Sequence, residues 1–224
     1  MAEQKGRRKG PRDGEATREA LMDAAERLFA EQGVEAVSIR AVNTAAGLAP
    51  AAVHYHFGTK EALLEAVLLR RGRAVVADIC ARCDDLLERP ERPDPHDIVD
   101  ALVSPYATLL ERDGAGGGRW LSIVGQLTLS GNDQMAPSAR PATERLQTLI
   151  HRAFPDTPED ALETAWSLTV EALILLMARG PESWFAQGEE AAATRRTLVA
   201  FAVGGLTSAL TEAGTSAQPT VSES

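Results

Sequence analysis

The chain has 224 residues, of which 44% are hydrophobic and 25% are charged, proportions that are ordinary for a soluble folded protein. A chain of this length can bury enough apolar surface to fold without disulfides, and its two cysteines favour a reducing compartment. No apolar run reaches the roughly 18 residues of a membrane span, and the charged N-terminus lacks the apolar core of a signal peptide. Composition therefore excludes membrane-spanning, disulfide-rich secreted and fibrous proteins, and it predicts a cytoplasmic globular protein.

The net charge of −9 is distributed unevenly along the chain. Residues 1–60 hold 9 Lys/Arg against 8 Asp/Glu, a net charge of +1, whereas residues 61–224 hold 14 against 24, a net charge of −10. The first 14 residues are markedly basic. This asymmetry predicts either a solvated, disordered arm or an arm that contacts a polyanion, and charge alone leaves both interpretations open.

Apolar periodicity and capping residues predict four helices in the first 90 residues. The first follows the N-cap Thr17 and ends at Gly33, and the second runs from Ile39 to Ala46 after the N-cap Ser38. The third runs from Pro50 to about His56, and the fourth from the N-cap Thr59 to about Glu88.

The rest of the chain is also helical in pattern, and the whole is expected to be an all-α protein of about nine helices. Glycines at 113–118 predict a flexible linker, and the small polar residues 213–224 predict a disordered tail. The β-branched residues near 123 leave a strand conceivable in the segment that contains them. The expected helices cover 97–112 with a kink at Pro105, 120–129, a segment that ends near 153 after a turn at Pro137 and Pro141, 159–178, and 189–212.

The most informative stretch is residues 38–57, in which two short helices join through Gly47, Leu48 and Ala49. Gly47 can take the left-handed conformation that a tight helix–helix turn needs. The apolar residues around it are spaced to form one small core. This pattern predicts a helix-turn-helix, whose second helix can enter the major groove of DNA. The core positions are Ile39, Val42, Leu48, Val53 and Phe57.

Five blocks of sequence occur in order within residues 17–64. They are Thr17-Arg18-Glu19-Ala20-Leu21, Leu28-Phe29-Ala30-Glu31-Gln32-Gly33, Val37-Ser38-Ile39-Arg40, Ala46-Gly47-Leu48 and Tyr55-His56-Phe57-Gly58-Thr59-Lys60-Glu61-Ala62-Leu63. In this order they resemble the tetracycline-repressor (TetR) family of bacterial regulators, and the last block is the most specific. The remaining chain, about 160 residues, matches only in length and helical character, as the variable ligand-binding part of that family does.

Composition and resemblance together suggest four parts. These are a basic disordered arm at 1–14, a helix-turn-helix DNA-binding domain at 15–62, a ligand-binding and dimerisation domain at 63–212, and a disordered tail at 213–224.

The resemblance implies double-stranded operator DNA as a partner, with Lys60 at a phosphate. Tyr55 and His56 form the aromatic pair of the recognition helix. Pro50 and Ala51 have no hydrogen-bonding side chains, so they can contact only thymine methyl groups or fit the shape of the DNA. The residues expected at the DNA are Ser38, Arg40, Pro50, Ala51, His54, Tyr55, His56, Thr59 and Lys60.

The sequence departs from the commoner family pattern in the turn and in both helices. Ala49 stands where Ser is usual, so one side-chain cap is missing, and Pro50 partly compensates because its fixed φ suits a first helical turn. His54 stands where many members have Tyr. Asn43 replaces a usual Ala, which is unexpected in a packed helix.

The expected helix 159–178 is apolar nearly all round, so it must be buried on more than one side. Gly204 and Gly205 weaken the last helix by about 1 kcal/mol each relative to Ala, a cost that fits a close approach of another backbone. A two-fold homodimer through these two helices is expected, as the resemblance also implies, and it predicts a palindromic operator. The interface residues are Leu173, Phe201, Gly204 and Gly205.

The middle helices are expected to enclose a cavity for a small-molecule effector, although plain core packing explains any single residue as well. Trp120 and Trp166 suit an amphipathic ligand because their large apolar rings carry a polar edge. Gln126 could orient it, and the scarcity of charge favours an apolar or weakly polar compound. The full set is Tyr106, Trp120, Val124, Gln126, His151, Trp166 and Met177.

The preferred interpretation is a repressor that a small molecule releases from DNA. An activator or a ligand-independent DNA binder is the alternative within the same class. Cys80 and Cys83 raise a third alternative, a thiol oxidoreductase, although core packing explains them better. His54 and His56 point to different helix faces, so no metal is expected, and no cofactor or membrane contact is expected either.

Overall fold

The structure is a computed structural model that describes residues 11–132, 134, 136–179 and 189–216. The chain divides into two units, residues 1–70 and 71–224, and passes from one to the other within helix α4 (Lys60–Leu87). The division lies eight residues beyond the boundary expected at residue 62. The described residues contain helices and no strands, which confirms the all-α fold and excludes the strand considered near residue 123.

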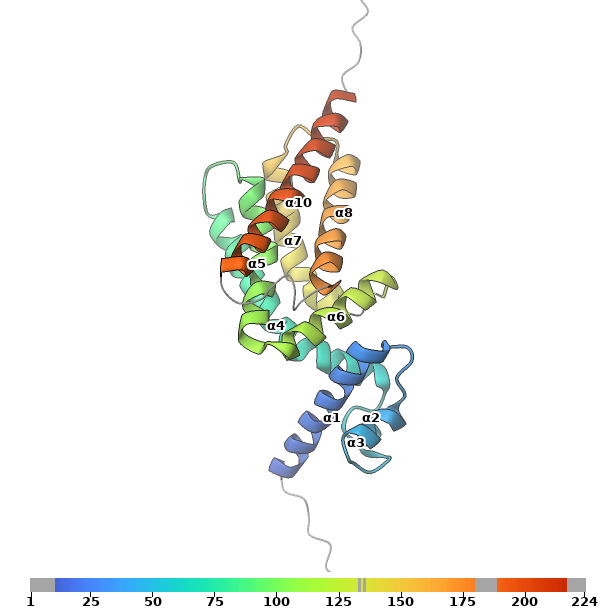
Figure 1. The fold of residues 1–224 in the computed structure, drawn as a ribbon. Coiled ribbons are helices and arrows are strands. Elements are labelled where there is room, and N and C mark those ends of the chain that lie inside the picture. Colours follow the sequence, from blue (N-terminus) through green and yellow to red (C-terminus); the bar gives the residue numbers. More distant parts are fainter. Residues whose placement is uncertain (1–10, 133, 135, 180–188, 217–224) are drawn as a thin grey trace, which may run out of the picture. The chain divides into compact units, whose positions relative to one another are not determined.

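The first unit contains three complete helices and the start of α4 (Figure 1). Helix α1 spans Pro11–Gln32, α2 spans Ile39–Ala45 and α3 spans Ala52–His56. Six apolar side chains from α1, α3 and α4 are fully buried and form the centre of the unit: Leu21, Ala25, Phe29, Val53, Leu63 and Val67.

The N-terminal expectation requires a correction. Helix α1 begins at Pro11 rather than after Thr17, so residues 11–14 are helical and do not belong to an arm. A proline at the first helical position loses no hydrogen bond, because the first amides of a helix have no intrahelical acceptor. The rest of the expected arm, residues 1–10, lies outside the described residues.

The second unit is built around α5 (Pro95–Asp113), which packs against α6 (Ala115–Leu129), α7 (Ala136–Ala153) and α10 (Glu189–Ser216). Helix α8 (Glu159–Arg179) packs against α6 and α10, and it lies beside α10 in Figure 1. Residues 101–107 of α5 are all buried, which marks α5 as the central helix. Pro105 lies inside this helix without ending it.

The flexible linker expected at 113–118 is wrong. Only Gly114, with a φ of 51°, separates α5 from α6, and Gly116, Gly117 and Gly118 are buried in the first turn of α6. A Cβ on Gly117 would lie 3.0 Å from the carbonyl oxygen of Leu109. Close packing against α5 therefore requires these small residues, which are not there to provide flexibility.

The start of helix α7 and the end of helix α10 also differ from expectation. Helix α7 begins at Ala136 and contains both prolines that were expected to form a turn. Pro137 lies in the first turn, where its missing N–H is not needed, and only Pro141 removes a hydrogen bond. Helix α10 continues to Ser216, so the expected tail at 213–224 is partly helical, and residues 217–224 lie outside the described residues.

Candidate nucleic-acid interface and internal cavity

The helix-turn-helix is formed by α2, a tight turn and α3. Gly47 has a φ of 66°, and the amides of Gly47 and Leu48 donate to the carbonyls of Thr44 and Asn43 at 3.1 and 2.9 Å. These bonds satisfy the last carbonyls of α2 while the glycine reverses the chain direction. The left-handed glycine predicted from the sequence is confirmed.

Asn43 holds the two helices of the motif together. Its side chain is 2% exposed, its Nδ2 donates to the Pro50 carbonyl at 2.6 Å, and its Oδ1 accepts the Val53 amide at 3.1 Å. The N-cap residue of α3, Ala51, provides no side-chain hydrogen bond. Asn43 on α2 therefore supplies from outside the helix a cap that α3 lacks, which explains an amide at a packed position.

The exposed side of α3 carries one large aromatic side chain, that of Tyr55. Tyr55 is 85% exposed and contacts His56 edge-on, with the ring centroids 5.0 Å apart. His54 Nδ1 lies 2.7 Å from the Gly58 carbonyl, and since a carbonyl only accepts, Nδ1 carries the hydrogen and donates. The His54 side chain thus holds the end of α3, Tyr55 is exposed on this helix, and Pro50 and Ala51 are exposed just before it begins.

The remaining residues expected at DNA lie at the N-termini of α2 and α4. The hydroxyls of Ser38 and Thr59 accept the amides of Ala41 and Ala62, each at 3.1 Å, so the predicted caps are confirmed. Arg40 is exposed on the first turn of α2. Lys60 Nζ donates to the Glu35 carbonyl at 3.2 Å, a contact that sequence reasoning missed because the two residues lie 25 positions apart.

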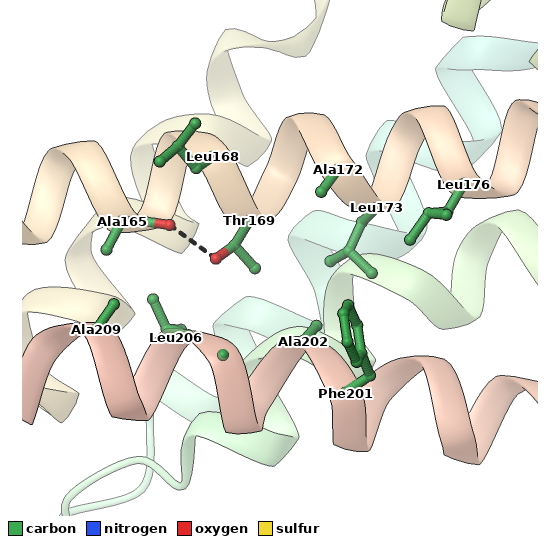
Figure 2. Close-up of a pocket in the computed structure, with 11 residues that line it drawn as sticks. Ala165, Leu168, Thr169, Ala172, Leu173, Leu176, Phe201, Ala202, Leu206 and Ala209 are labelled. Carbon is green, nitrogen blue, oxygen red and sulfur yellow. Dashed lines mark hydrogen bonds between the residues drawn. The ribbon is translucent and has the colours of Figure 1, made fainter.

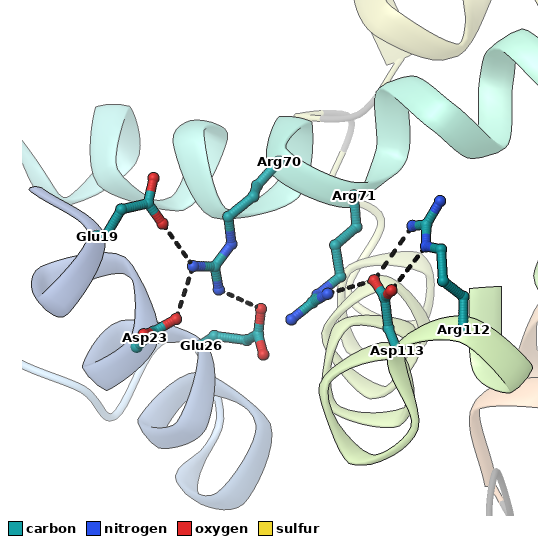
Figure 3. A network of polar contacts seen from close by, with 7 residues as sticks. All are labelled: Glu19, Asp23, Glu26, Arg70, Arg71, Arg112 and Asp113. Carbon is teal, nitrogen blue, oxygen red and sulfur yellow. Dashed lines mark hydrogen bonds and ion pairs between the residues drawn. The ribbon is translucent and has the colours of Figure 1, made fainter. Parts of the chain in front are cut away.

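An ion-pair cluster, buried at Glu26 and open to solvent at Asp23, joins α4 to α1 within the first unit (Figure 3). Arg70 contacts Glu19, Asp23 and Glu26 at 3.2, 2.7 and 2.6 Å, and the Glu26 side chain is 1% exposed. Burial opposes the charge of Arg70, but the hydrogen bonds to Glu26 and Asp23 together outweigh it and raise the pKa of Arg70. The cluster fixes the last residue of the first unit to its longest helix.

The next residue, Arg71, is anchored within the second unit (Figure 3). It forms an ion pair with Asp113 at the end of α5, and Arg112 contacts the same carboxylate at 2.7 Å. The hydrogen bond from Arg112, with a smaller contribution from Arg71, lowers the pKa of Asp113. A side chain at Gly116 would collide with the Arg71 guanidinium, so this glycine makes room for the ion pair.

The second unit encloses a cavity of about 180 Å³ lined by α4, α5, α6, α7 and α8. Four of the seven residues expected at a ligand line it: Tyr106, Trp120, Val124 and Trp166. The α4 residues Gly72, Val75, Val76 and Ile79 line it too, and sequence reasoning missed them although their apolar spacing marks one face of that helix.

The other three expected ligand residues are not brought to the cavity. His151 is exposed near the end of α7, and Met177 is fully buried in α8 without lining the cavity. Gln126 is half-buried, and its Nε2 lies 3.5 Å from Ser122 Oγ on its own helix. Apolar periodicity identifies buried faces, but it does not tell which buried side chains border a void.

A second hollow of about 240 Å³ is an open groove between α8 and α10 (Figure 2). Three of the four residues predicted at a dimer interface, Leu173, Phe201 and Gly205, line this groove, whereas Gly204 lies outside it. Phe201 is 71% exposed, and Leu168 on the facing helix is 63% exposed. The groove is apolar except for Thr169, whose hydroxyl donates to the Ala165 carbonyl at 2.7 Å.

Helix α8 is the one helix among the described residues that is long and apolar enough to cross a membrane by length and composition, although core helices of soluble proteins pass the same test. Glu163 and Glu171 are exposed along it, whereas Trp166 and Leu173 are buried. In the part of the chain that the structure covers, no group of three or more His, Cys, Asp or Glu is arranged to hold a metal ion.

Comparison with known proteins agrees with both units. Residues 21–67 match the model of the tetR family of bacterial regulatory proteins, and residues 100–205 match that of the tetracyclin repressor-like C-terminal domain. The HTH-type transcriptional repressor AcnR of Corynebacterium diphtheriae is 28% identical over 174 residues, which are 74% of this chain and 83% of that protein.

Solved structures share the fold. A TetR family transcription regulator from Marinobacter aquaeolei VT8 has a TM-score of 0.60 at 16% identity, covering 88% of this chain and 98% of that one. NalD, the secondary repressor of the MexAB-OprM multidrug efflux pump in Pseudomonas aeruginosa, has a TM-score of 0.58 at 21% identity, covering 88% and 98%.

A helix-turn-helix unit joined to a larger helical unit with its own cavity defines a DNA-binding transcriptional regulator. The family models match in the expected order along the chain. The chain belongs to the TetR family of bacterial regulators.

Proposed function

We propose that this regulator is a homodimeric repressor that binds a palindromic operator and is released from it by a small molecule in the cavity. The observation that carries the proposal is that one helix, α4, belongs both to the helix-turn-helix unit and to the cavity wall. The same helix begins with Lys60 in the helix-turn-helix unit and provides Gly72, Val75, Val76 and Ile79 to the cavity wall. Repression, rather than activation, is supported by AcnR, which is a repressor. A regulator of transcription works in the cytoplasm.

At the operator, Tyr55 is proposed to contact the DNA directly, since it is a large aromatic side chain of α3 that is 85% exposed. Lys60 is proposed to bind a phosphate. Its ammonium group has three hydrogens and donates one of them to the Glu35 carbonyl. The other two remain available to bind a DNA phosphate. Ser38, Arg40 and Thr59 lie at helix N-termini, where amides and the helix dipole favour phosphate.

The dimer is proposed to form when a second copy covers the α8–α10 groove. Leu168 and Phe201 leave large apolar areas exposed on facing helices. A Cβ on Gly204 or Gly205 would meet no atom within 4 Å in the single chain, so packing within the chain does not explain these glycines. A second backbone approaching closely does explain them.

Occupation of the cavity is proposed to act on the DNA-binding unit through α4. Arg70 and Arg71 are adjacent in that helix, and each is fixed by ion pairs within a different unit. Gly72 and Val75, which line the cavity, follow within about one turn. A ligand that shifts this part of α4 therefore acts next to both anchors, and two half-sites must dock at a fixed spacing.

Selection of DNA from a pool of random duplexes tests the proposal. The full chain should enrich two inverted half-sites whose centres lie about one helical turn, or a multiple of it, apart. Tyr55→Ala should lose this selection, while Gln32→Ala, an exposed truncation in α1, should keep it. Recovery of single, unpaired half-sites, or of no sequence at all, would refute the dimeric operator.

A further inference from the structure

The cavity of the second unit has a chemical character that restricts what it can bind. None of the described residues that line it is charged. Burying an ionised group without a compensating charge is strongly unfavourable, so this wall rejects ions. Tyr106 and Trp120 form an aromatic corner with ring centroids 6.3 Å apart, which suits a flat apolar ring.

Tyr106 provides a polar group that the fold leaves unused. Its side chain is 8% exposed and lines the cavity, and its hydroxyl makes no hydrogen bond to any described residue. Burial raises the pKa of Tyr106 to about 12, so the phenol stays protonated at physiological pH and remains a donor. Because Tyr106 lines the cavity, its hydroxyl can donate to a ligand oxygen there, and that hydrogen bond adds to the affinity of the ligand.

The neighbouring hydroxyls of the wall are already engaged. Thr128 Oγ1 donates to the Val124 carbonyl at 3.0 Å, and Thr143 Oγ1 donates to the Ala139 carbonyl at 3.3 Å, each within its own helix. Asn132 is exposed, and its Oδ1 accepts the Gln134 amide. Among the hydroxyls of the wall, that of Tyr106 is therefore the one whose hydrogen is not already donated to the protein, and we take it as the group that orients a ligand.

The size of the cavity sets the size of the ligand. An apolar cavity of about 150 Å³ in another protein admits benzene, and this one measures about 180 Å³. It therefore fits one ring with a small substituent. We propose that the effector is an uncharged, single-ring compound whose oxygen accepts a hydrogen bond from the Tyr106 hydroxyl. This inference rests on the proposed function of the cavity as the effector site.

Three probes of nearly equal shape separate the effect of a hydrogen-bond acceptor from the effect of a charge: acetophenone, α-methylstyrene and benzoate. They share a ring and an equal number of heavy atoms. The first has a neutral acceptor, the second has none and the third is charged. In calorimetric titrations of the full chain, acetophenone should bind about threefold to tenfold more tightly than α-methylstyrene, the usual effect of one neutral hydrogen bond. Benzoate should bind at least about a hundredfold more weakly than acetophenone.

Two variants test whether Tyr106 causes the preference for acetophenone over α-methylstyrene. Tyr106→Phe keeps the ring and removes the hydroxyl, so it should reduce acetophenone affinity to the level of α-methylstyrene while leaving α-methylstyrene within about twofold. Thr143→Val is the matched control, because it removes a hydroxyl from the same wall that is already bonded within α7. It should leave the preference for acetophenone unchanged.

The outcomes distinguish the inference from the function on which it depends. Binding of acetophenone and α-methylstyrene with equal affinity, or tighter binding of benzoate, would overturn the proposed chemistry while leaving the cavity a ligand site. A preference that survives Tyr106→Phe would overturn the role of Tyr106. Failure of all three probes to bind would overturn both the inference and the cavity as an effector site.

Discussion

Truncation of Asn43 offers a sharp test of how the recognition helix is held. Asn43→Ala removes the acceptor of the Val53 amide and the donor to the Pro50 carbonyl. Val53 is fully buried, so its amide loses a bond that water cannot easily replace, whereas Pro50 is exposed and its carbonyl can turn to water. One orphaned buried donor costs about 1–3 kcal/mol, so we expect α3 to lose about 2 kcal/mol of local stability.

Hydrogen exchange of the amides of α3 measures this loss directly. A change of about 2 kcal/mol corresponds to roughly thirtyfold faster exchange at Val53, and it limits the loss of operator affinity to about the same factor. Thr44→Ala is the matched control, since it truncates the next, exposed residue of α2 and should leave the exchange unchanged. Equal protection of Val53 in the wild type and in Asn43→Ala would refute the capping role.

Three further experiments test the DNA contact, the dimer and the cysteines. Lys60→Ala should weaken binding to all DNA sequences and reduce the slope of log K against log salt by about one unit, and an unchanged slope would contradict a phosphate contact. Gly205→Leu places a side chain in space that is open in the single chain, so light scattering should show monomers, whereas Ser208→Leu, outside the groove, should remain dimeric. Burial raises the pKa of Cys83 to about 12. Iodoacetamide should therefore modify Cys80 first and Cys83 only on unfolding, and equal rates by mass spectrometry would contradict this.

The local parts of the fold could be predicted because local physics determines them. Ser38, Gly47 and Thr59 mark helix ends through hydrogen bonds that span only three to five residues, and all three lie where the sequence placed them. The sequence showed that Asn43 is unusual for a packed helix position. It could not show the capping role of Asn43, because the bonded partners lie seven and ten residues away across a turn.

The glycine-rich segment shows where sequence reasoning fails. A run of glycines looks the same in a sequence whether the glycines make the chain flexible or make room for a neighbouring group. At Gly116 and Gly117 the neighbours are Arg71 and Leu109, and only the packing of α6 against them reveals that the small residues are required. Packing between helices, which the sequence does not reveal, also decides which side chains line the cavity. Met177 and His151 were therefore predicted at a cavity that neither of them lines.

The ion pairs of α4 connect acidic residues of α1 to the helix that lines the cavity. Glu19, Asp23 and Glu26 recur on one face of α1, a pattern that is normally a solvated stripe, yet Glu26 is buried. A buried carboxylate requires a cation, and Arg70 supplies it. Arg71, one peptide bond later, forms its own ion pair with Asp113 inside the other unit. In the proposed mechanism, a ligand that moves the cavity-lining part of α4 therefore acts beside both ion pairs.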